Sequence, residues 1–166
     1  FQKPWLEKPV VFVGLGDSVT RGLGADMRHT YFPLLLNNND AFYPDMAGKD
    51  LSHVVTVQSH RNYAQDYTVS QEHIDRQLVK IPQYNKSVYG IVVLTSGGND
   101  LIHDYGRSEP QQDAMYGCSY KQGQEWCELL KTRLDTLLKG LMQKFPGGCD
   151  IFFANIYDPT DGAGDP

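Results

Sequence analysis

Ser18 lies in a polar turn that directly follows an apolar run. Residues 10–15 (VVFVGL) predict a buried strand, and residues 16–22 (GDSVTRG) come next. A helix that starts beside the serine would direct N–H groups and the positive end of its dipole at an oxygen that becomes negative. This arrangement suits acyl transfer, in which a hydroxyl attacks a carbonyl carbon. Ser18 is therefore the candidate nucleophile, and its own N–H is a candidate oxyanion donor.

A second polar turn follows another apolar run. Residues 90–95 (GIVVLT) predict a strand, and residues 96–100 (SGGND) follow it. The amide of Asn99 carries two N–H donors, and Gly97 and Gly98 let it leave the sheet without steric conflict. Loss of one oxyanion donor typically costs about 2.7–4 kcal/mol of transition-state stabilisation. Two such turns at two strand ends predict one shared site.

Together, the two turns resemble the motifs of the SGNH hydrolases, also called the GDSL esterase and lipase family. Residues 16–22 match the form GDSxTxG, and residues 97–100 (GGND) match GxND. The resemblance implies a carboxylic ester hydrolase without a cofactor or metal, in which Ser18 and Asn99 donate to the oxyanion. Asp17 is then an orienting group or a helix cap. The first motif alone would also fit an ordinary capped helix start.

The family has a third oxyanion donor, the N–H of a glycine in a stretch of the form Asn-x-Ala-x-x-Gly. The corresponding residues 62–68 (NYAQDYT) keep the asparagine and the alanine. Asp66 or Tyr67 replaces the glycine, depending on the alignment. A backbone N–H can also come from a residue other than glycine, so either position is a candidate for the third donor.

The histidine that would activate the serine is missing from its usual place. SGNH hydrolases carry Asp-x-x-His near the C-terminus, and no histidine follows His103 here. Residues 50–53 (DLSH) and 100–103 (DLIH) have this spacing, but the first pair precedes the second strand and the aspartate of the second belongs to the Asn99 motif. The remaining histidines are interpreted as surface or structural groups: His29, His53, His60 and His73. We expect the base on a further C-terminal segment, and the 166 residues alone to be nearly inactive.

Length and composition predict one globular domain. The 166 residues are 40% hydrophobic and 21% charged, with a formal net charge of −5. The 15 basic residues are scattered, which argues against a nucleic acid partner, and no apolar run reaches the roughly 20 residues that cross a bilayer. We expect a single domain over residues 1–166 that is incomplete at its C-terminus. From the resemblance, we expect a secreted or periplasmic protein whose partners are a small-molecule or glycan ester and a C-terminal fragment of the same protein.

Four apolar runs predict strands, at residues 10–15, 54–59, 91–95 and 151–156. Their nearly uniform apolarity favours a parallel sheet buried on both faces. Leucines at intervals of three and four predict a helix over residues 124–144 that ends at the sequence FPGG, and a further helix is expected from Ser70. This order of elements predicts a three-layer α/β/α sandwich, which the resemblance identifies as the flavodoxin-like SGNH fold without its last strand and helix.

Three other features leave alternatives open. Residues 29–50 are expected to form a short helix and a loop near the site, and residues 103–123 an insertion. The three cysteines are Cys118, Cys127 and Cys149. They are compatible with a local disulfide between Cys118 and Cys127, and equally with three buried thiols. Oxygen ligands for calcium and a solvated turn are both compatible with Asp158, Asp161 and Asp165.

Two other function classes compete with the esterase. A binding module of the same fold would hold a glycan or an acyl ester without cleaving it; the absent histidine favours this class, and the presence of Ser18 and Asn99 opposes it. A dinucleotide-binding turn at residues 14–16 is disfavoured because Val19 stands at the third glycine of the pattern GxGxxG.

Overall fold

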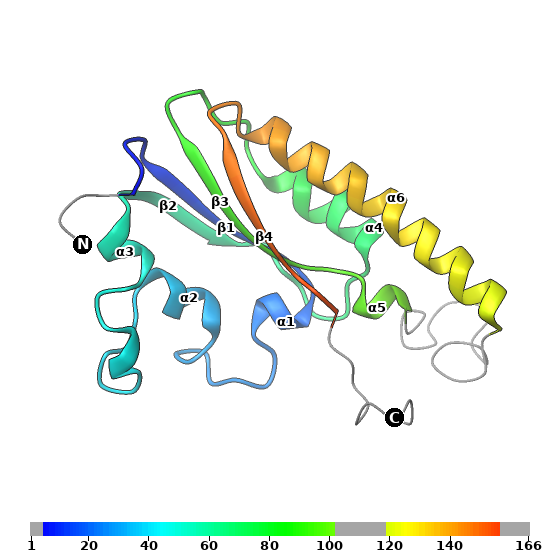
Figure 1. Ribbon diagram of the computed structural model, residues 1–166, viewed down its shortest axis with the longest axis horizontal. Helices are drawn as coiled ribbons and strands as arrows, with labels where there is room; N and C mark the ends of the chain where they lie inside the picture. The colour runs from blue at the N-terminus through cyan, green and yellow to red at the C-terminus, as the bar shows by residue number, and fades with distance from the viewer. Residues whose placement is uncertain (1–4, 102–118, 157–166) are drawn as a thin grey trace.

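The computed structural model describes residues 5–101 and 119–156 (Figure 1). In chain order, the elements are β1 (Val10–Gly16), α1 (Ser18–Arg21), α2 (Tyr31–Leu36), η1 (Pro44–Met46), α3 (Leu51–Val54), β2 (Val57–Asn62), α4 (Ser70–Glu72), η2 (His73–Gln77), η3 (Leu78–Lys80), β3 (Tyr89–Thr95), α5 (Gly98–Leu101), α6 (Tyr120–Lys144) and β4 (Cys149–Ala154). Of these, η1 and η3 are 3-10 turns and η2 is a π-helical turn. The strands are parallel and lie in the order β2-β1-β3-β4.

Helices cover both faces of the sheet. The first three, α1 to α3, lie on one face, and α4 and α6 lie on the other (Figure 1). Successive side chains of a strand point to opposite faces, so β1 contributes to two cores. Val11, Val13 and Leu15 share a core with α6, whereas Phe12 stacks on Phe32 of α2 with ring centroids 4.3 Å apart. The predicted three-layer α/β/α sandwich with a parallel sheet is confirmed.

The two edge strands differ from the prediction that all four are buried on both faces. The central strands β1 and β3 are buried, but every residue of β2 and β4 is exposed or half-buried. In β2, polar side chains from Gln58 to Asn62 suit a solvated edge. This strand also begins at Val57 rather than at Val54, because residues 51–54 form α3 and pack Val54 into the core beneath the sheet.

The long helix α6 begins four residues earlier than the predicted start at residue 124. Ser119 forms a capping box: its Oγ accepts a hydrogen bond from the Gln122 N–H at 3.3 Å, and the Gln122 Oε1 accepts one from the Ser119 N–H at 2.8 Å. Residues 120–123, expected in the insertion, are therefore helical. At the other end, Gly148 has a φ of +106° and leads the chain into β4, as the FPGG sequence predicts. Within the two described ranges, no helix is long and apolar enough to cross a membrane.

The helix expected from Ser70 begins at that residue but is irregular. One turn of α-helix, α4, widens into the π-helical turn η2 and then tightens into η3. His73 and Gln77 of η2 are completely buried beneath the ends of β1 and β3. In residues 29–50, the expected short helix is α2, and η1 lies in the loop after it.

Candidate active site

The turn after β1 holds Ser18 at the start of α1. Gly16 has a φ of +132°, and a Cβ there would overlap the carbonyl oxygen of Thr95, so only glycine fits. Ser18 is half-buried. Within residues 5–101 and 119–156, its Oγ has no hydrogen-bond partner and its N–H has no acceptor. The described part of the chain therefore uses neither group in a hydrogen bond of its own.

Asp17 caps α1 and fixes the turn to β3. Its buried Oδ1 accepts hydrogen bonds from the Val19 N–H at 2.9 Å and from the Thr95 hydroxyl at 2.8 Å. The Thr20 and Thr95 hydroxyls are 2.8 Å apart in the same network. Because Asp17 supplies the cap, the hydroxyl of Ser18 is not used for that purpose.

Asn99 lies in α5 at the end of β3, and it is buried. Its Nδ2 donates a hydrogen bond to the carbonyl oxygen of Thr68 at 2.8 Å, which orients the amide and leaves it a second N–H. Gly97 has a φ of +110°, and a Cβ there would crowd Ile156 and Leu130. A Cβ at Gly98 would meet only open space, so that position tolerates a side chain.

The two turns meet at one end of the sheet. Gly16 and Thr95, the last residues of β1 and β3, are partners in the parallel register. The chain crosses from β1 to β2 on one side of this pair and continues through β3 to β4 on the other. Open α/β sheets bind ligands at such a switch point, outside the carboxyl ends of the strands.

The loop after β2 reaches the same end of the sheet. Asn62 holds it there, because its Nδ2 donates to the carbonyl oxygen of Thr20 at 3.0 Å and its Oδ1 accepts from the Ala64 N–H at 3.0 Å. Tyr67 has a φ of +63°, the left-handed value that glycine adopts most easily. Asp66 instead forms an ion pair with Arg21 at 3.3 Å. Of the two candidates for the glycine position, Tyr67 has the glycine-type backbone.

A buried polar cluster, which the sequence did not predict, lies beneath these turns and consists of Thr68, His73, Gln77 and Ser96. The imidazole of His73 lies 3.0 Å from the Thr68 hydroxyl through Nε2 and 2.9 Å from the Ser96 hydroxyl through Nδ1. Burial lowers the pKa of His73, and the negative charges of Asp17, Asp100 and Glu72 only partly oppose this effect. A polar pair at positions i and i+4, set among the apolar residues Ile74, Leu78 and Ile81, was the available signal.

Neither His73 nor His53 is placed to act on Ser18. The imidazole nitrogens of His73 are both engaged in the buried cluster. His53 Nδ1 pairs with Asp50 Oδ1 at 2.8 Å in the DLSH sequence, but α3 precedes β2 and so lies at the amino end of the sheet, away from α1 (Figure 1). In the second Asp-x-x-His match, Asp100 accepts hydrogen bonds from both the N–H and the hydroxyl of Ser70 and pairs with Arg133, and His103 lies outside the described residues.

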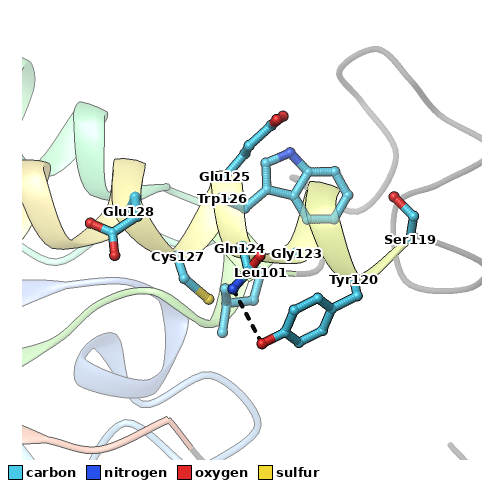
Figure 2. Close-up of a pocket in the computed structure, with 9 residues that line it drawn as sticks. All are labelled: Leu101, Ser119, Tyr120, Gly123, Gln124, Glu125, Trp126, Cys127 and Glu128. Carbon is cyan, nitrogen blue, oxygen red and sulfur yellow. Dashed lines mark hydrogen bonds between the residues drawn. The ribbon is translucent and has the colours of Figure 1, made fainter.

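A separate hollow of about 940 Å³ lies along the first turns of α6 (Figure 2). It is lined by Leu101 and by all residues of the segment 119–128 except Lys121 and Gln122. Within it, the Gln124 side-chain amide donates to the Tyr120 hydroxyl at 3.2 Å. None of the predicted site residues lines this hollow. Across the described part of the chain, no group of three His, Cys, Asp or Glu side chains could hold a metal ion.

Two open questions from the sequence fall partly outside the described residues. Cys118 and the three aspartates at 158, 161 and 165 lie there, so neither the local disulfide nor the calcium loop is tested. Cys127 is exposed and Cys149 half-buried, so the alternative of three buried thiols is wrong, and neither cysteine forms a disulfide with a described residue. Burial raises the pKa of the Cys149 thiol, which keeps that group protonated at neutral pH.

The solved structures that share this fold include two proteins from Streptomyces. One is phospholipase A1 from Streptomyces albidoflavus NA297, with a TM-score of 0.51 and 20% identity over 86% of this chain and 58% of that one. The other is an extracellular lipase from Streptomyces rimosus, with a TM-score of 0.52 and 16% identity over 94% of this chain and 66% of that one. The chain thus spans less than two thirds of either enzyme. No protein-family model and no curated protein sequence matches it, and at these identities the likeness establishes the fold alone.

Proposed function

We propose that this chain carries the nucleophile and the oxyanion donors of a serine hydrolase that cleaves acyl esters, as its resemblance to the SGNH hydrolases implies. The observation that carries the proposal is the hydrogen bonding around Ser18. Its Oγ and its N–H have no partner among the described residues, although the turn that holds them is tightly bonded on both sides. The ordinary structural role for a serine in such a turn is to cap the helix, and here Asp17 has that role.

In the proposed reaction, the Ser18 Oγ attacks the carbonyl carbon of the ester while a base takes the hydroxyl proton. The carbonyl oxygen becomes negative and accepts hydrogen bonds from the Ser18 N–H and from the second N–H of Asn99. When the carbonyl re-forms, the bond to the alcohol oxygen breaks and the base returns its proton to that oxygen. Water, activated by the same base, then releases the acid and regenerates Ser18.

The left-handed backbone of Tyr67 supports it, rather than Asp66, as the position of the third donor. A residue other than glycine in this conformation costs about 1–3 kcal/mol and is held by its surroundings, often at functional sites. Here the surroundings include two bonds to the Gly16 carbonyl oxygen, from the Gln65 N–H at 3.1 Å and from the Thr68 hydroxyl at 3.2 Å.

We place the base on a C-terminal segment beyond these 166 residues. The engagement of His73 and the remote position of His53 support this placement, as does the greater length of the two Streptomyces enzymes. The test compares the native protein, characterised by its intact mass, with the 166-residue chain. We expect the native protein to hydrolyse p-nitrophenyl esters far faster. A native species that ends at Pro166 and is fully active would contradict the placement.

The substrate is proposed to be an ester with an acetyl or short acyl group, in a secreted protein. Val19 and Leu23 flank the nucleophile and expose 45% and 59% of their surface, so apolar area is available beside Ser18 for an acyl chain. The names of the two Streptomyces proteins, a phospholipase and an extracellular lipase, support an ester substrate, and the second name supports secretion. A series of p-nitrophenyl esters of increasing chain length, followed by acetylated glycans, would define the preference.

Labelling with a fluorophosphonate tests the nucleophile directly, because this probe reacts with an activated serine. In the native protein, we expect one modified residue, identified as Ser18 by peptide mass. Ser18→Ala should abolish the label, whereas Ser87→Ala, at an exposed serine bonded to Asn85, should retain it. Labelling that persists in Ser18→Ala would refute the proposal.

The binding module is the second candidate, favoured by the engagement of His73 in the buried cluster and by the remote position of His53. It predicts no fluorophosphonate label and no ester hydrolysis by the native protein, together with saturable binding of an acetylated glycan or acyl ester. Calorimetric titration of the native protein would detect that binding, and Asn99→Ala should weaken it.

A further inference from the structure

We propose that Gln77 is a positioning residue for the nucleophile, an inference that rests on the proposed function. Its side-chain amide grips the peptide groups on both sides of Gly16. The Oε1 accepts a hydrogen bond from the Gly16 N–H at 2.9 Å, and the Nε2 donates one to the Gly16 carbonyl oxygen at 2.9 Å. Gln77 is completely buried, so water does not compete for these bonds.

These two hydrogen bonds restrain the most flexible residue of the turn. Glycine has more backbone freedom than any other residue type, and the φ of Gly16, +132°, lies outside the range of ordinary residues. Gln77 fixes the peptide planes before and after it, and Asp17 is fixed by Thr95 at 2.8 Å. The Ser18 N–H comes directly after these two restrained residues, Gly16 and Asp17, so its direction is restrained as well.

The same side chain couples the nucleophile turn to the oxyanion amide. The Nε2 of Gln77 also donates to the Thr68 hydroxyl at 3.3 Å, and the carbonyl oxygen of Thr68 accepts the bond from Asn99 at 2.8 Å. Gln77 thus contacts both the residue that sets Ser18 and the residue that sets Asn99. The geometry points to a buried amide that fixes these two donors relative to each other.

The direction of the bonds in the cluster is consistent with a neutral His73. The Thr68 hydroxyl lies 2.8 Å from the carbonyl oxygen of Gln65 and 3.2 Å from that of Gly16, and both oxygens can only accept its single proton. The hydroxyl therefore accepts from Gln77 and from His73 Nε2. His73 then carries its proton on Nε2, and Nδ1 accepts from Ser96. Every polar group beneath Gly16 is satisfied in this arrangement, which holds Gln77 in one orientation.

The test uses the native protein with Gln77→Met, which keeps the length of the side chain and removes both bonds to Gly16. The matched control is Ile81→Val, which lowers stability in the same buried layer without touching the turn. We expect Gln77→Met to slow fluorophosphonate labelling of Ser18 by about tenfold to a hundredfold, the loss typical of a misplaced catalytic group. The amide resonance of Ser18 should shift and exchange of the Gly16 N–H should accelerate, and Ile81→Val should change neither. Equal effects of the two variants would overturn the proposal.

Two further outcomes separate this inference from the proposed function. If the unmodified protein is not labelled, the proposed function fails. The hydrogen-exchange rate of the Gly16 N–H then tests the role of Gln77 by itself, and a Gly16 N–H that stays protected from exchange in Gln77→Met overturns that role. If Gln77→Met does not fold, the test is hydrogen exchange of the Gln77 side-chain amide protons in the unmodified protein. They should exchange at least about tenfold more slowly than those of the exposed Gln83, and equal rates overturn the grip.

Discussion

Gly16 joins the nucleophile turn to the sheet under two separate constraints, its positive φ and its contact with Thr95. Gly16→Ala should therefore lower the free energy of unfolding by about 2–4 kcal/mol, because backbone strain and overpacking add. Gly24→Ala is the matched control: its φ is +89°, but a Cβ there would meet nothing within 4 Å. It should cost only about 1 kcal/mol. Urea unfolding measures both values, and equal losses would show that the contact with Thr95 is unimportant.

Tyr67 stores strain that a glycine would release. Elsewhere, alanine is more favourable than glycine because it restricts the unfolded chain, but a left-handed residue reverses this order. Tyr67→Gly should therefore be more stable than Tyr67→Ala by about 0.5–1 kcal/mol. At Tyr43, whose φ is −130°, the glycine variant should be the less stable of the two. Thermal unfolding of the four variants tests the sign, and the same order at both tyrosines would contradict a strained Tyr67.

The two turns of the candidate site could be predicted from the sequence, because each turn is recognisable from a few consecutive residues. Ser18 and Asn99 each follow an apolar run, and register brings the two turns to one end of the sheet. Their supports could not be predicted in this way. Gln77 reaches Gly16 across 61 positions, and Thr95 reaches Asp17 across 78. Such contacts depend on the packing of distant elements, which no local pattern records.

Among the elements, the π-helical turn η2 gives the fold a pH dependence through His73. Burial lowers the pKa of His73, so the unfolded chain binds a proton at a pH where the folded chain does not. The contribution of neutral His73 to the free energy of unfolding is therefore fully present above its ordinary pKa of about 6.5. As the pH drops below that value, the free energy of unfolding falls by at most about 1.4 kcal/mol per pH unit. We expect urea unfolding to give a lower free energy of unfolding at about pH 5.5 than at about pH 7.5.

Variants assign this loss to one histidine. His73→Gln keeps the ability to bond Thr68 and Ser96 and removes the ionisation, so its stability should change much less over the same range. His60→Gln, on the exposed edge strand β2, should behave like the unmodified protein. If the pH dependence persists in His73→Gln, another group causes it.

Strands and helices followed the apolar pattern where both faces of the sheet are covered, as in β1 and β3. The pattern failed at β2 because Val54 and Val55 are apolar for another reason: they pack α3 and the turn after it beneath the sheet. The strand itself starts at Val57, and only polar residues follow up to its end at Asn62. An edge strand is held by its backbone bonds to one neighbour, so its side chains need not be apolar. The irregular helix after Ser70 was likewise set by the buried bonds of His73 and Gln77, which override helical periodicity.

In the molecule as a whole, the two ends of the sheet carry different chemistry. At the amino end, Asp50 is almost completely buried and accepts hydrogen bonds from the Ser52 hydroxyl at 2.5 Å, His53 Nδ1 at 2.8 Å and the Asn38 N–H at 3.2 Å. Burial by itself would raise the pKa of Asp50, but these bonds and the charge of His53 lower it to about 2. His53 is half-exposed, so this pair braces α3 and presents one face to solvent.

The lowered pKa makes Asp50 a source of acid sensitivity. Its contribution to stability is fully present above the ordinary pKa of about 3.8 and is lost as the pH falls to about 2. A shift of this size corresponds to about 2 kcal/mol. Asp50→Asn should therefore lower the free energy of unfolding by about 1–2 kcal/mol at pH 7, and it should remove this loss between pH 4 and pH 2. Urea unfolding at the three pH values is the measurement.

The same variant tests whether the ends of the sheet act independently. Residues 50–53 have the Asp-x-x-His spacing of an activating pair, yet α3 enters β2 from the amino end while Ser18 follows β1 at the carboxyl end. A base must lie within hydrogen-bond reach of the proton that it takes. Asp50→Asn and His53→Ala should consequently leave the rate of Ser18 labelling in the native protein unchanged within about twofold, since the pair cannot reach the hydroxyl. A tenfold loss in either variant would mean that this pair acts on Ser18, and the base would then belong to the described chain.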